Sequence, residues 1–383
     1  MITKEGKKLF SLILVLTVMV GVFIPVKGVL AASSSSKSNG EVVKELIEEY
    51  SIESGINYNT ILNRAVQNYL QSLGGLSFKN LSNSLNLSLH GDSSDAPLIV
   101  CNPNPKENDQ KFAIRSIGEA VQLYPFRFAS RKYDMKMKNI TAVQGGDSRI
   151  YCRLETQQDD YNSYYWLICN VNEDLSNFTV AFKSLANGYY ISLNGEDSNS
   201  QNGNPLELIE YRYNLSLQEW TVQHRSINFW VYDANGKAVS LNTDTFVETV
   251  KRTINSMRET TIDRLKTYHF MVTNWNTPVN VGGKCAKYAA NCLNAGGIES
   301  VNSGYVPTFK KEISAIAEAH TMKSLSYSDN PYLEVGDCVV YGGRHVVIIS
   351  SICGNSIYYA AHNNPHAYAP LYKESGATYY HIK

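Results

Sequence analysis

The chain has 383 residues, which exceeds one ordinary hydrophobic core and predicts two or three domains. Lys and Arg together number 35, as do Asp and Glu, so the formal net charge at pH 7 is zero. Because no basic excess exists to neutralise phosphates, the composition argues against a nucleic-acid partner.

The N-terminus has the pattern of a secretion signal. A basic segment precedes an apolar run over 9–26, and the small residues Val29 and Ala31 follow at the spacing of a cleavage site. We expect cleavage to remove residues 1–32, with an uncleaved membrane anchor as the alternative because the run is long. The mature protein is expected to be secreted, with the cell wall as a surface of association. No later apolar run predicts a membrane span after cleavage.

The number of cysteines is odd. The seven are Cys101, Cys152, Cys169, Cys285, Cys292, Cys338 and Cys353. An odd number in an exported chain leaves at least one thiol outside any disulfide within the chain. The other six allow 15 pairings, among which the sequence does not choose. The count is a first indication that one cysteine has a chemical role.

Two regions with different hydrophobic patterns precede the C-terminal third of the chain. Residues 33–75 predict a polar linker and short helices, since apolar residues fall on one helical face until Gly74 and Gly75. Over 76–245, short alternating runs are separated by Gly, Asn, Asp and Pro, which predicts an all-β domain.

Three similar segments recur in this β region, at 86–112, 135–166 and 190–220. Each contains two strands around a polar loop and ends at an aromatic residue, namely Phe112, Trp166 and Trp220. These aromatics are spaced 54 residues apart in both cases. Three copies of a four-strand unit predict a closed threefold barrel whose core the aromatics share.

The repeats resemble the ricin-type β-trefoil lectins. The sequences QKF (110–112) and QEW (218–220) match the repeated Q-x-W of that family, and YYW (164–166) is a degenerate copy. The resemblance implies a β-trefoil over 76–245 with a carbohydrate-binding or targeting role. Ser88, Lys136 and Ser192 stand where the sugar sites of the family carry an acid. The remaining candidate sugar pocket comprises Ser88, Asp92, Asp109 and Gln110, with a polar turn on a structural barrel as the alternative.

The segment GGKCAKYAANCLNAGG (282–297) predicts a helix between two glycine pairs. Cys285 falls in its first turn, where unpaired N–H groups and the positive dipole end favour a thiolate and can bind an oxyanion. Cys292 falls two turns later and is expected to be buried. The spacing of the two cysteines excludes a normal disulfide between them and lacks the pattern of a zinc site, so neither metal nor cofactor is expected.

Three strand-like runs follow, DCVVY, HVVIIS and SIYYAAH, and predict an antiparallel sheet. His345 opens the second run and His362 closes the third. Since adjacent antiparallel strands bring such positions together, we expect His345 to face Cys285 as the base and His362 to orient its ring. Asn363 or Asn364 is the alternative third member.

The order of these motifs resembles the papain-like cysteine hydrolases of the NlpC and CHAP type, in particular the amidase domain family of secreted Gram-positive proteins. The matching residues are GGKCAKYAANCLNAGGI, GDCVVYGGRHVVIIS and AAHNNP. The resemblance implies an α+β papain-like fold over 246–383, with Cys285 as nucleophile, His345 as general base and His362 as orienting residue. The family usually has an acid directly before the cysteine, where this chain has Lys284. Lys284 and Gly283 are expected to contact the substrate, and the positive charge of Lys284 is expected to favour a substrate carboxylate.

Together these patterns predict a secreted cysteine amidase or endopeptidase that cleaves amide bonds, foremost in peptidoglycan, and uses the trefoil for targeting. One alternative is a glycan-binding or wall-binding protein without turnover. The other is a secreted effector that acts on host protein.

Overall fold

A computed structural model describes residues 37–91, 96–129, 138–144, 150–156, 163–169, 171, 175–176, 178–193, 206–209, 213–214, 219–220, 227–259, 261–276, 284–362, 366–372 and 376–382. The predicted signal over 1–32 lies outside these residues, as do Asp92, Gly283, Asn363 and Asn364. Residues Ser38–Lys383 form one compact unit. In the part of the chain that is described, no helix has the length and hydropathy needed to cross a membrane.

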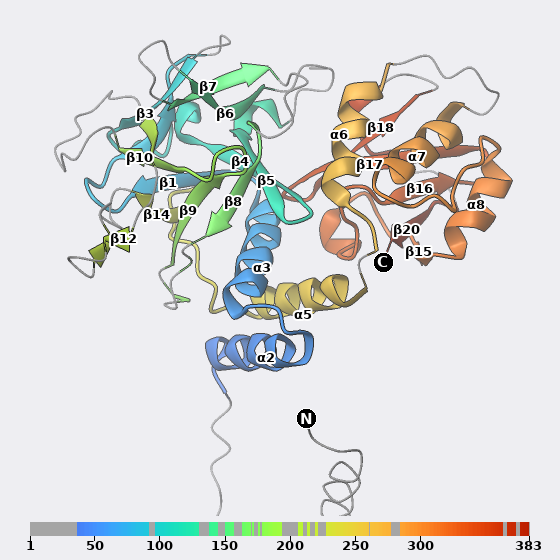
Figure 1. The fold of residues 1–383 in the computed structure, drawn as a ribbon, viewed down its shortest axis with the longest axis horizontal. Coiled ribbons are helices and arrows are strands. Elements are labelled where there is room, and N and C mark those ends of the chain that lie inside the picture. Colours follow the sequence, from blue (N-terminus) through green and yellow to red (C-terminus); the bar gives the residue numbers. More distant parts are fainter. Residues whose placement is uncertain are drawn as a thin grey trace, which may run out of the picture. The chain divides into compact units, whose positions relative to one another are not determined.

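Three helices pack against one another beside the β region (Figure 1). They are α2 (Asn39–Ser54), α3 (Tyr58–Leu73) and α5 (Asp244–Glu259). The first helix begins at Ser38, whose hydroxyl accepts from the N–H of Glu41 while the Glu41 carboxylate accepts from the N–H of Ser38. This reciprocal cap satisfies two N–H groups that a helix start leaves unpaired.

The β region is a single 12-stranded sheet. Its strands are β1 (Leu76–Asn80), β2 (Asn86–Leu89), β3 (Ala96–Cys101), β4 (Phe112–Ile117), β5 (Ala120–Pro125), β6 (Lys138–Gln144), β7 (Ile150–Thr156), β8 (Trp166–Cys169), β9 (Thr179–Ser184), β10 (Tyr190–Leu193), β11 (Leu206–Ile209) and β14 (Phe229–Asp233). Short 3₁₀ turns lie at Asn108–Gln110 and Phe126–Phe128. A separate ribbon joins β12 (Tyr213–Asn214) to β13 (Glu219–Trp220).

The strand pairing is that of a β-trefoil. Strands β1, β4, β5, β8, β9 and β14 pair in that order, and β14 pairs back with β1, so they close a barrel. The remaining strands form the hairpins β2–β3, β6–β7 and β10–β11. These hairpins also pair with each other through β3–β7 and β7–β11. A closed barrel capped by three hairpins removes the exposed sheet edges that would otherwise promote aggregation.

The three repeats superimpose by register, and this corrects one prediction. The first residue of the fourth strand in each repeat faces the first strand of the same repeat: Leu76 opposite Phe112, Val121 opposite Trp166, and Val180 opposite Phe229. The third equivalent aromatic is therefore Phe229. The prediction of Trp220 was wrong, because Trp220 belongs to the β12–β13 ribbon and pairs with Tyr213 outside the barrel.

The equivalent aromatic residues of the three repeats fill the barrel core. Phe112, Trp166 and Phe229 are fully buried. The ring of Phe182 lies 5.1 Å from that of Phe78, edge to face, and 6.3 Å from that of Phe229. Contacts of this kind add to the free energy gained by burying the rings. Each repeat thus contributes one aromatic residue to the barrel core, from the same strand position.

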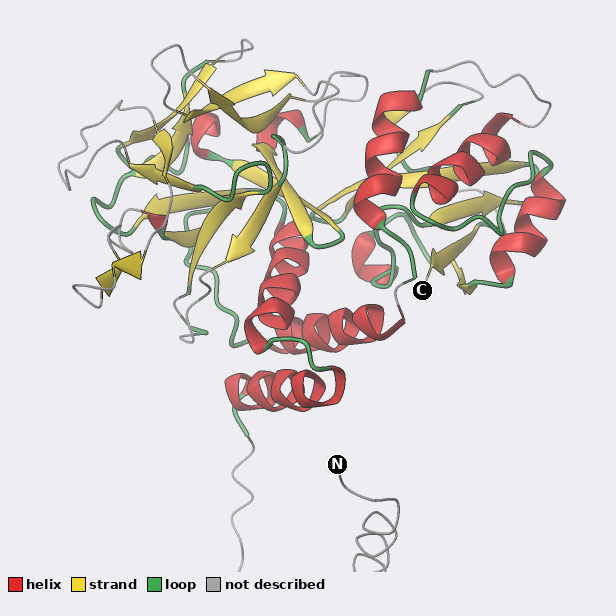
Figure 2. Cartoon of the chain, in the orientation of Figure 1, coloured by secondary structure: helices red, strands yellow, loops and turns green. Residues whose placement is uncertain are grey.

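The C-terminal part combines helices with one antiparallel sheet (Figure 2). Its helices are α6 (Arg264–Asn274), α7 (Lys284–Ala295) and α8 (Val306–Ser314), with a 3₁₀ turn at Tyr327–Asp329. The strands, in sheet order, are β15 (Ala317–Thr321), β20 (Thr378–Ile382), β16 (Cys338–Tyr341), β17 (His345–Cys353), β18 (Ser356–Ala361) and β19 (His366–Pro370). This is the predicted helix and antiparallel sheet, while the papain-like assignment stays a prediction.

The sheet separates two cores. Val346 and Ile348 pack with α6, α7 and the barrel residue Tyr124 in what we call the inner core. Val347 and Ile349 pack with Tyr341 and Tyr359 in what we call the outer core. Because successive residues of a strand point to opposite faces, the two sets alternate along β17. The inner core therefore joins the C-terminal sheet to the barrel.

Candidate functional site

Cys285 lies at the start of α7, where the sequence predicted it. The helix begins at Lys284, which is exposed, and Cys285 turns inward with 2% of its surface exposed. Tyr288, Ala289 and Cys292 share this buried face at intervals of three, four and seven residues, which are the intervals of one helical stripe. The thiol is not in a disulfide. Its position in the first turn places unpaired backbone N–H groups beside it.

His362 lies against the same face of α7. It directly follows β18 and is buried, and its ring centroid is 5.4 Å from that of Tyr288. The Tyr288 hydroxyl donates to the backbone carbonyl of Met271 on α6, which fixes the position of that ring. Since Tyr288 is one turn along from Cys285, His362 lies beside the first two turns of the cysteine helix.

His345 lies on the other face of the sheet. It is the register partner of Tyr341, and the two rings stack with centroids 6.3 Å apart. Tyr341 belongs to the outer core, whereas Cys285 belongs to the inner core. The prediction that His345 faces Cys285 is therefore wrong in this structure. The physical reason is the period of two along a strand, by which a single residue changes the face.

The other cysteines of the C-terminal part are suited to packing. Burial raises the pKa of the Cys292 thiol, and the same cause, followed by the charge of Asp337, raises the pKa of Cys338 well above its ordinary value. Burial also raises the pKa of Cys353. A thiol that stays protonated is a poor nucleophile, so these residues act as small apolar side chains.

Two residues of the predicted sugar pocket in the first repeat, Gln110 and Asp109, are bonded to other groups of the protein. Gln110 is buried; its amide nitrogen donates to the carbonyl of Asn102 at 2.8 Å, and its oxygen accepts from the side chain of Asn86 at 3.0 Å. Asp109 forms an ion pair with Arg127, and Ser88 is buried on β2. Asp92 lies outside the described residues. The contacts of Gln110 and Asp109 favour the alternative of a polar turn on a structural barrel, and the sugar pocket stays a prediction.

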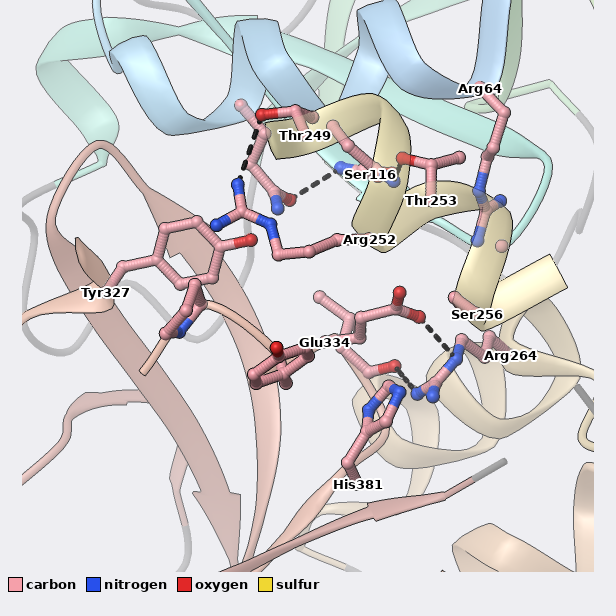
Figure 3. A pocket seen from close by; sticks show the side chains of 16 residues that line it. Arg64, Ser116, Thr249, Arg252, Thr253, Ser256, Arg264, Tyr327, Glu334 and His381 are labelled. Atoms are coloured by element: carbon pink, nitrogen blue, oxygen red, sulfur yellow. Dashed lines mark hydrogen bonds and ion pairs between the residues drawn. The ribbon is translucent and has the colours of Figure 1, made fainter. Parts of the chain in front are cut away.

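A polar pocket that the sequence did not reveal lies between α3, α5 and the C-terminal sheet (Figure 3). Its cavity volume is about 30 Å³, and it is partly open to solvent. Basic side chains line it together with hydroxyl groups and one carboxylate, namely Arg64, Arg252, Arg264, His381, Thr249, Thr253, Tyr327 and Glu334. Its residues come from segments far apart in the chain and form no sequence motif, which is why sequence reasoning missed it.

One wall of this polar pocket is a buried ion-pair network. Arg264 lies 2.8 Å from a carboxylate oxygen of Glu334 and 3.0 Å from one of Asp337. It also donates to the carbonyl oxygens of Val335 and Ile382. The other oxygen of Asp337 lies 2.9 Å from Nδ1 of His381. Buried charges need such partners, because removing them from water is otherwise costly.

The network shifts the pKa values of its members. Burial acts to raise the pKa of Asp337, but the charges of Arg264 and His381 outweigh it, and the net pKa is lowered. Burial acts to lower the pKa of His381, but the charge and hydrogen bond of Asp337 outweigh it, and the net pKa is raised. The pair therefore favours a charged imidazolium against a carboxylate. Among the described residues no cluster of three His, Cys, Asp or Glu side chains is arranged to hold a metal ion.

Comparison with known proteins gives fold-level likenesses only. No family model matches the sequence, and no curated protein is similar to it. A mosquitocidal holotoxin shares 16% identity over 42% of this chain and 17% of its own, with a TM-score of 0.32. A ricin B-like lectin from Macrolepiota procera, in complex with lactose, shares 14% identity over 42% of this chain and 96% of its own (TM-score 0.31). The designed threefold protein ThreeFoil shares 10% identity over 42% of this chain and 99% of its own (TM-score 0.31). At scores this low, the trefoil assignment rests on the strand pairing described above.

Proposed function

We propose that this chain is a cysteine-dependent amide hydrolase in which Cys285 is the nucleophile and His362 the general base. The observation that carries the proposal is the position of the His362 ring, 5.4 Å from the Tyr288 ring on the helical face that also bears Cys285. A cysteine in the first turn of a helix with an imidazole beside that helix is the pairing that thiol hydrolases require. The substrate we propose is a peptide amide of peptidoglycan.

The reaction would proceed by acyl transfer. The Cys285 thiolate attacks the amide carbonyl carbon, and the oxyanion accepts hydrogen bonds from N–H groups in the first turn of α7. The His362 imidazolium gives its proton to the amide nitrogen, the C–N bond breaks, and an amine leaves a thioester on Cys285. The imidazole of His362 then takes a proton from water, whose oxygen attacks the thioester, and a carboxylic acid leaves as the thiol is restored.

Lys284 bears on substrate choice within this proposal. It is exposed at the first position of α7, directly before the nucleophile. An ammonium group there attracts a carboxylate and repels an amine, since opposite charges a few ångströms apart at a protein surface interact favourably. A peptide substrate with a free carboxylate near the scissile amide is therefore proposed.

The second candidate function is binding to glycan or cell wall without turnover, and a secreted effector that cleaves host protein is the third. The closed trefoil barrel favours the binding function, because it is a rigid scaffold whose loops present side chains to a ligand. The hydrogen bond of Gln110 to Asn102 and the ion pair of Asp109 with Arg127 weigh against the first repeat as the ligand site.

The test is incubation of the purified protein with purified peptidoglycan, followed by separation and mass spectrometry of the released fragments. The proposal expects new amino and carboxyl ends in equal amounts, and their identity gives the bond that is cut. Protein pretreated with iodoacetamide is the control and should release none. Protein that sediments with peptidoglycan but releases no new ends would favour the binding function, and cleavage of protein substrates alone would favour the effector.

A further inference from the structure

The polar pocket has two guanidinium groups for which the described residues show no ion pair. Glu334 and Asp337 are paired with Arg264, and Asp337 is also paired with His381. The guanidinium groups of Arg64 and Arg252 line the same space, and within the described parts of the chain neither forms an ion pair with a carboxylate.

Arg64 reaches the pocket from α3 with an unsatisfied donor. Its Nη1 atom is buried and makes no hydrogen bond with any described residue. Burial lowers the pKa of Arg64, as does the charge of Arg264, while the charges of Glu334 and Glu119 act in the opposite direction. A buried guanidinium donor without an acceptor costs free energy, and a bound acceptor would recover it.

Arg252 reaches the pocket from α5. Among the described residues it donates one hydrogen bond, to the hydroxyl of Thr249 on the same helix, at 3.1 Å. Figure 3 shows Arg252 beside Tyr327, whose hydroxyl points toward it, while Arg64 lies on the other side of the space. Two guanidinium groups from different helices therefore border one cavity.

Neutral donors complete the lining. Burial raises the pKa of Tyr327 to about 12, so its hydroxyl keeps its proton and can donate. The Thr253 oxygen accepts a hydrogen bond from the side chain of Asn68 at 3.1 Å, which leaves the Thr253 proton free to be donated. Guanidinium and hydroxyl donors around one space match an acceptor with several oxygens and negative charge.

We propose that the polar pocket binds a tetrahedral oxyanion, phosphate or sulfate, between the guanidinium groups of Arg64 and Arg252. The anion would bridge α3 and α5 to the segment that carries Tyr327, and it would form ion pairs with the two guanidinium groups there. The inference uses none of the residues assigned to amide hydrolysis, so it stands or falls independently of that proposal.

The test measures the thermal unfolding temperature of the purified full chain as sodium phosphate replaces sodium chloride at constant ionic strength. Binding to the folded state raises this temperature with a saturable dependence on ligand concentration. Arms with sodium sulfate and with glucose 6-phosphate separate a free inorganic anion from the phosphate group of a larger molecule. Saturable stabilisation by either phosphate source or by sulfate, beyond that of chloride, supports the proposal. A rise that stays linear in anion concentration is the general effect of phosphate and sulfate on folded proteins and counts against it.

Variants locate the effect. Arg64→Gln and Arg252→Gln should each weaken the apparent affinity for phosphate about tenfold or more, as expected for loss of a charged hydrogen bond. Lys251→Gln is the matched control, since it removes an exposed positive charge next to Arg252 that pairs with Glu248 on the same helix. It should leave the affinity unchanged.

A stability control keeps the test decisive. Arg64→Gln should not unfold the protein in chloride, because it removes an unpaired buried charge. Arg252→Gln gives a second, half-buried position if the first variant is unstable. The proposal is overturned if phosphate, sulfate and glucose 6-phosphate stabilise no more than chloride does, or if the folded Arg252→Gln variant keeps the affinity of the wild type.

Discussion

The ring of His362 lies 5.4 Å from the ring of Tyr288, on the side of α7 that buries Cys285. On the opposite face of the sheet, His345 stacks on Tyr341 at 6.3 Å. The two histidines end and begin neighbouring strands, yet only His362 lies with the cysteine helix. His362 is therefore the proposed base. The sequence pattern alone predicts that both histidines lie beside Cys285.

Replacement of each histidine by alanine should distinguish them. His362→Ala should lower the rate of amide cleavage about 10²- to 10⁴-fold, the usual contribution of a positioned general base. His345→Ala should change the rate only a few-fold, because its ring packs against the outer core. The measurement is the initial rate at which peptidoglycan releases amino groups, with far-UV circular dichroism to confirm folding. A larger loss in His345→Ala than in His362→Ala would refute the assignment.

The Asp337–His381 pair predicts a pH dependence of stability. The folded pKa of His381 is raised above its ordinary value of 6.5. Its contribution to stability is thus fully present below pH 6.5 and is lost as the pH rises through the folded pKa. The free energy of unfolding measured with urea should fall as the pH rises above 6.5 in the wild type, and His381→Asn should flatten this slope. An unchanged slope in the variant would show that the pair does not control it.

Arg115 should be irreplaceable by lysine. Its guanidinium carbon lies 4.8 Å from the ring of Tyr124 and 4.9 Å from that of Tyr368, and its Nε donates to the hydroxyl of Ser351 at 2.9 Å. These contacts join the barrel to the C-terminal sheet and need a planar group with several donors. Arg115→Lys should lower the free energy of unfolding by about 3 kcal/mol, in the range for a broken buried network.

The matched control is an exposed arginine. Arg258 pairs with Glu53 at the surface, and Arg258→Lys should cost about 1 kcal/mol or less. Urea unfolding of both variants gives the comparison. Equal effects of the two substitutions would contradict the role given to Arg115.

Phe229 should behave as a core residue of the barrel. It is fully buried and occupies the register position that Phe112 and Trp166 occupy in the other repeats. Phe229→Ala should lower the free energy of unfolding by about 3–5 kcal/mol through lost burial and the cavity left behind. A loss below 1 kcal/mol, which is typical of surface positions, would contradict its equivalence to Phe112. Chemical denaturation followed by tryptophan fluorescence measures this.

The sequence predicts a helix or strand correctly where neighbouring residues alone determine its ends. Glycine pairs are an example, since Gly296 and Gly297 were expected to end the cysteine helix. Gly297 has a φ of 95°, which favours glycine, and a Cβ on Gly296 would lie 2.9 Å from the carbonyl oxygen of Asp263. One glycine is needed for its conformation and the other for a close approach to α6.

The errors arose where the answer depends on register or on distant segments. Trp220 matched the spacing of the repeats, but the β12–β13 ribbon precedes the true fourth strand, so Phe229 takes the position. Counting residues does not reveal such an insertion. The face of His345 depends on a one-residue register, and the polar pocket unites Arg64 with His381 from opposite ends of the described chain. Neither leaves a local signal in the sequence.

The role of Cys285 as nucleophile is tested most directly by the rate of amide cleavage in two cysteine variants of the same helix. Cys285 and Cys292 are both buried on one face of α7, and alanine is compatible with a helix at either position. If Cys285 is the nucleophile, Cys285→Ala loses about a thousandfold or more of the initial rate on peptidoglycan. Cys292→Ala should retain activity within a few-fold. Equal rates for Cys285→Ala and the wild type would contradict the proposal that this chain is a cysteine hydrolase.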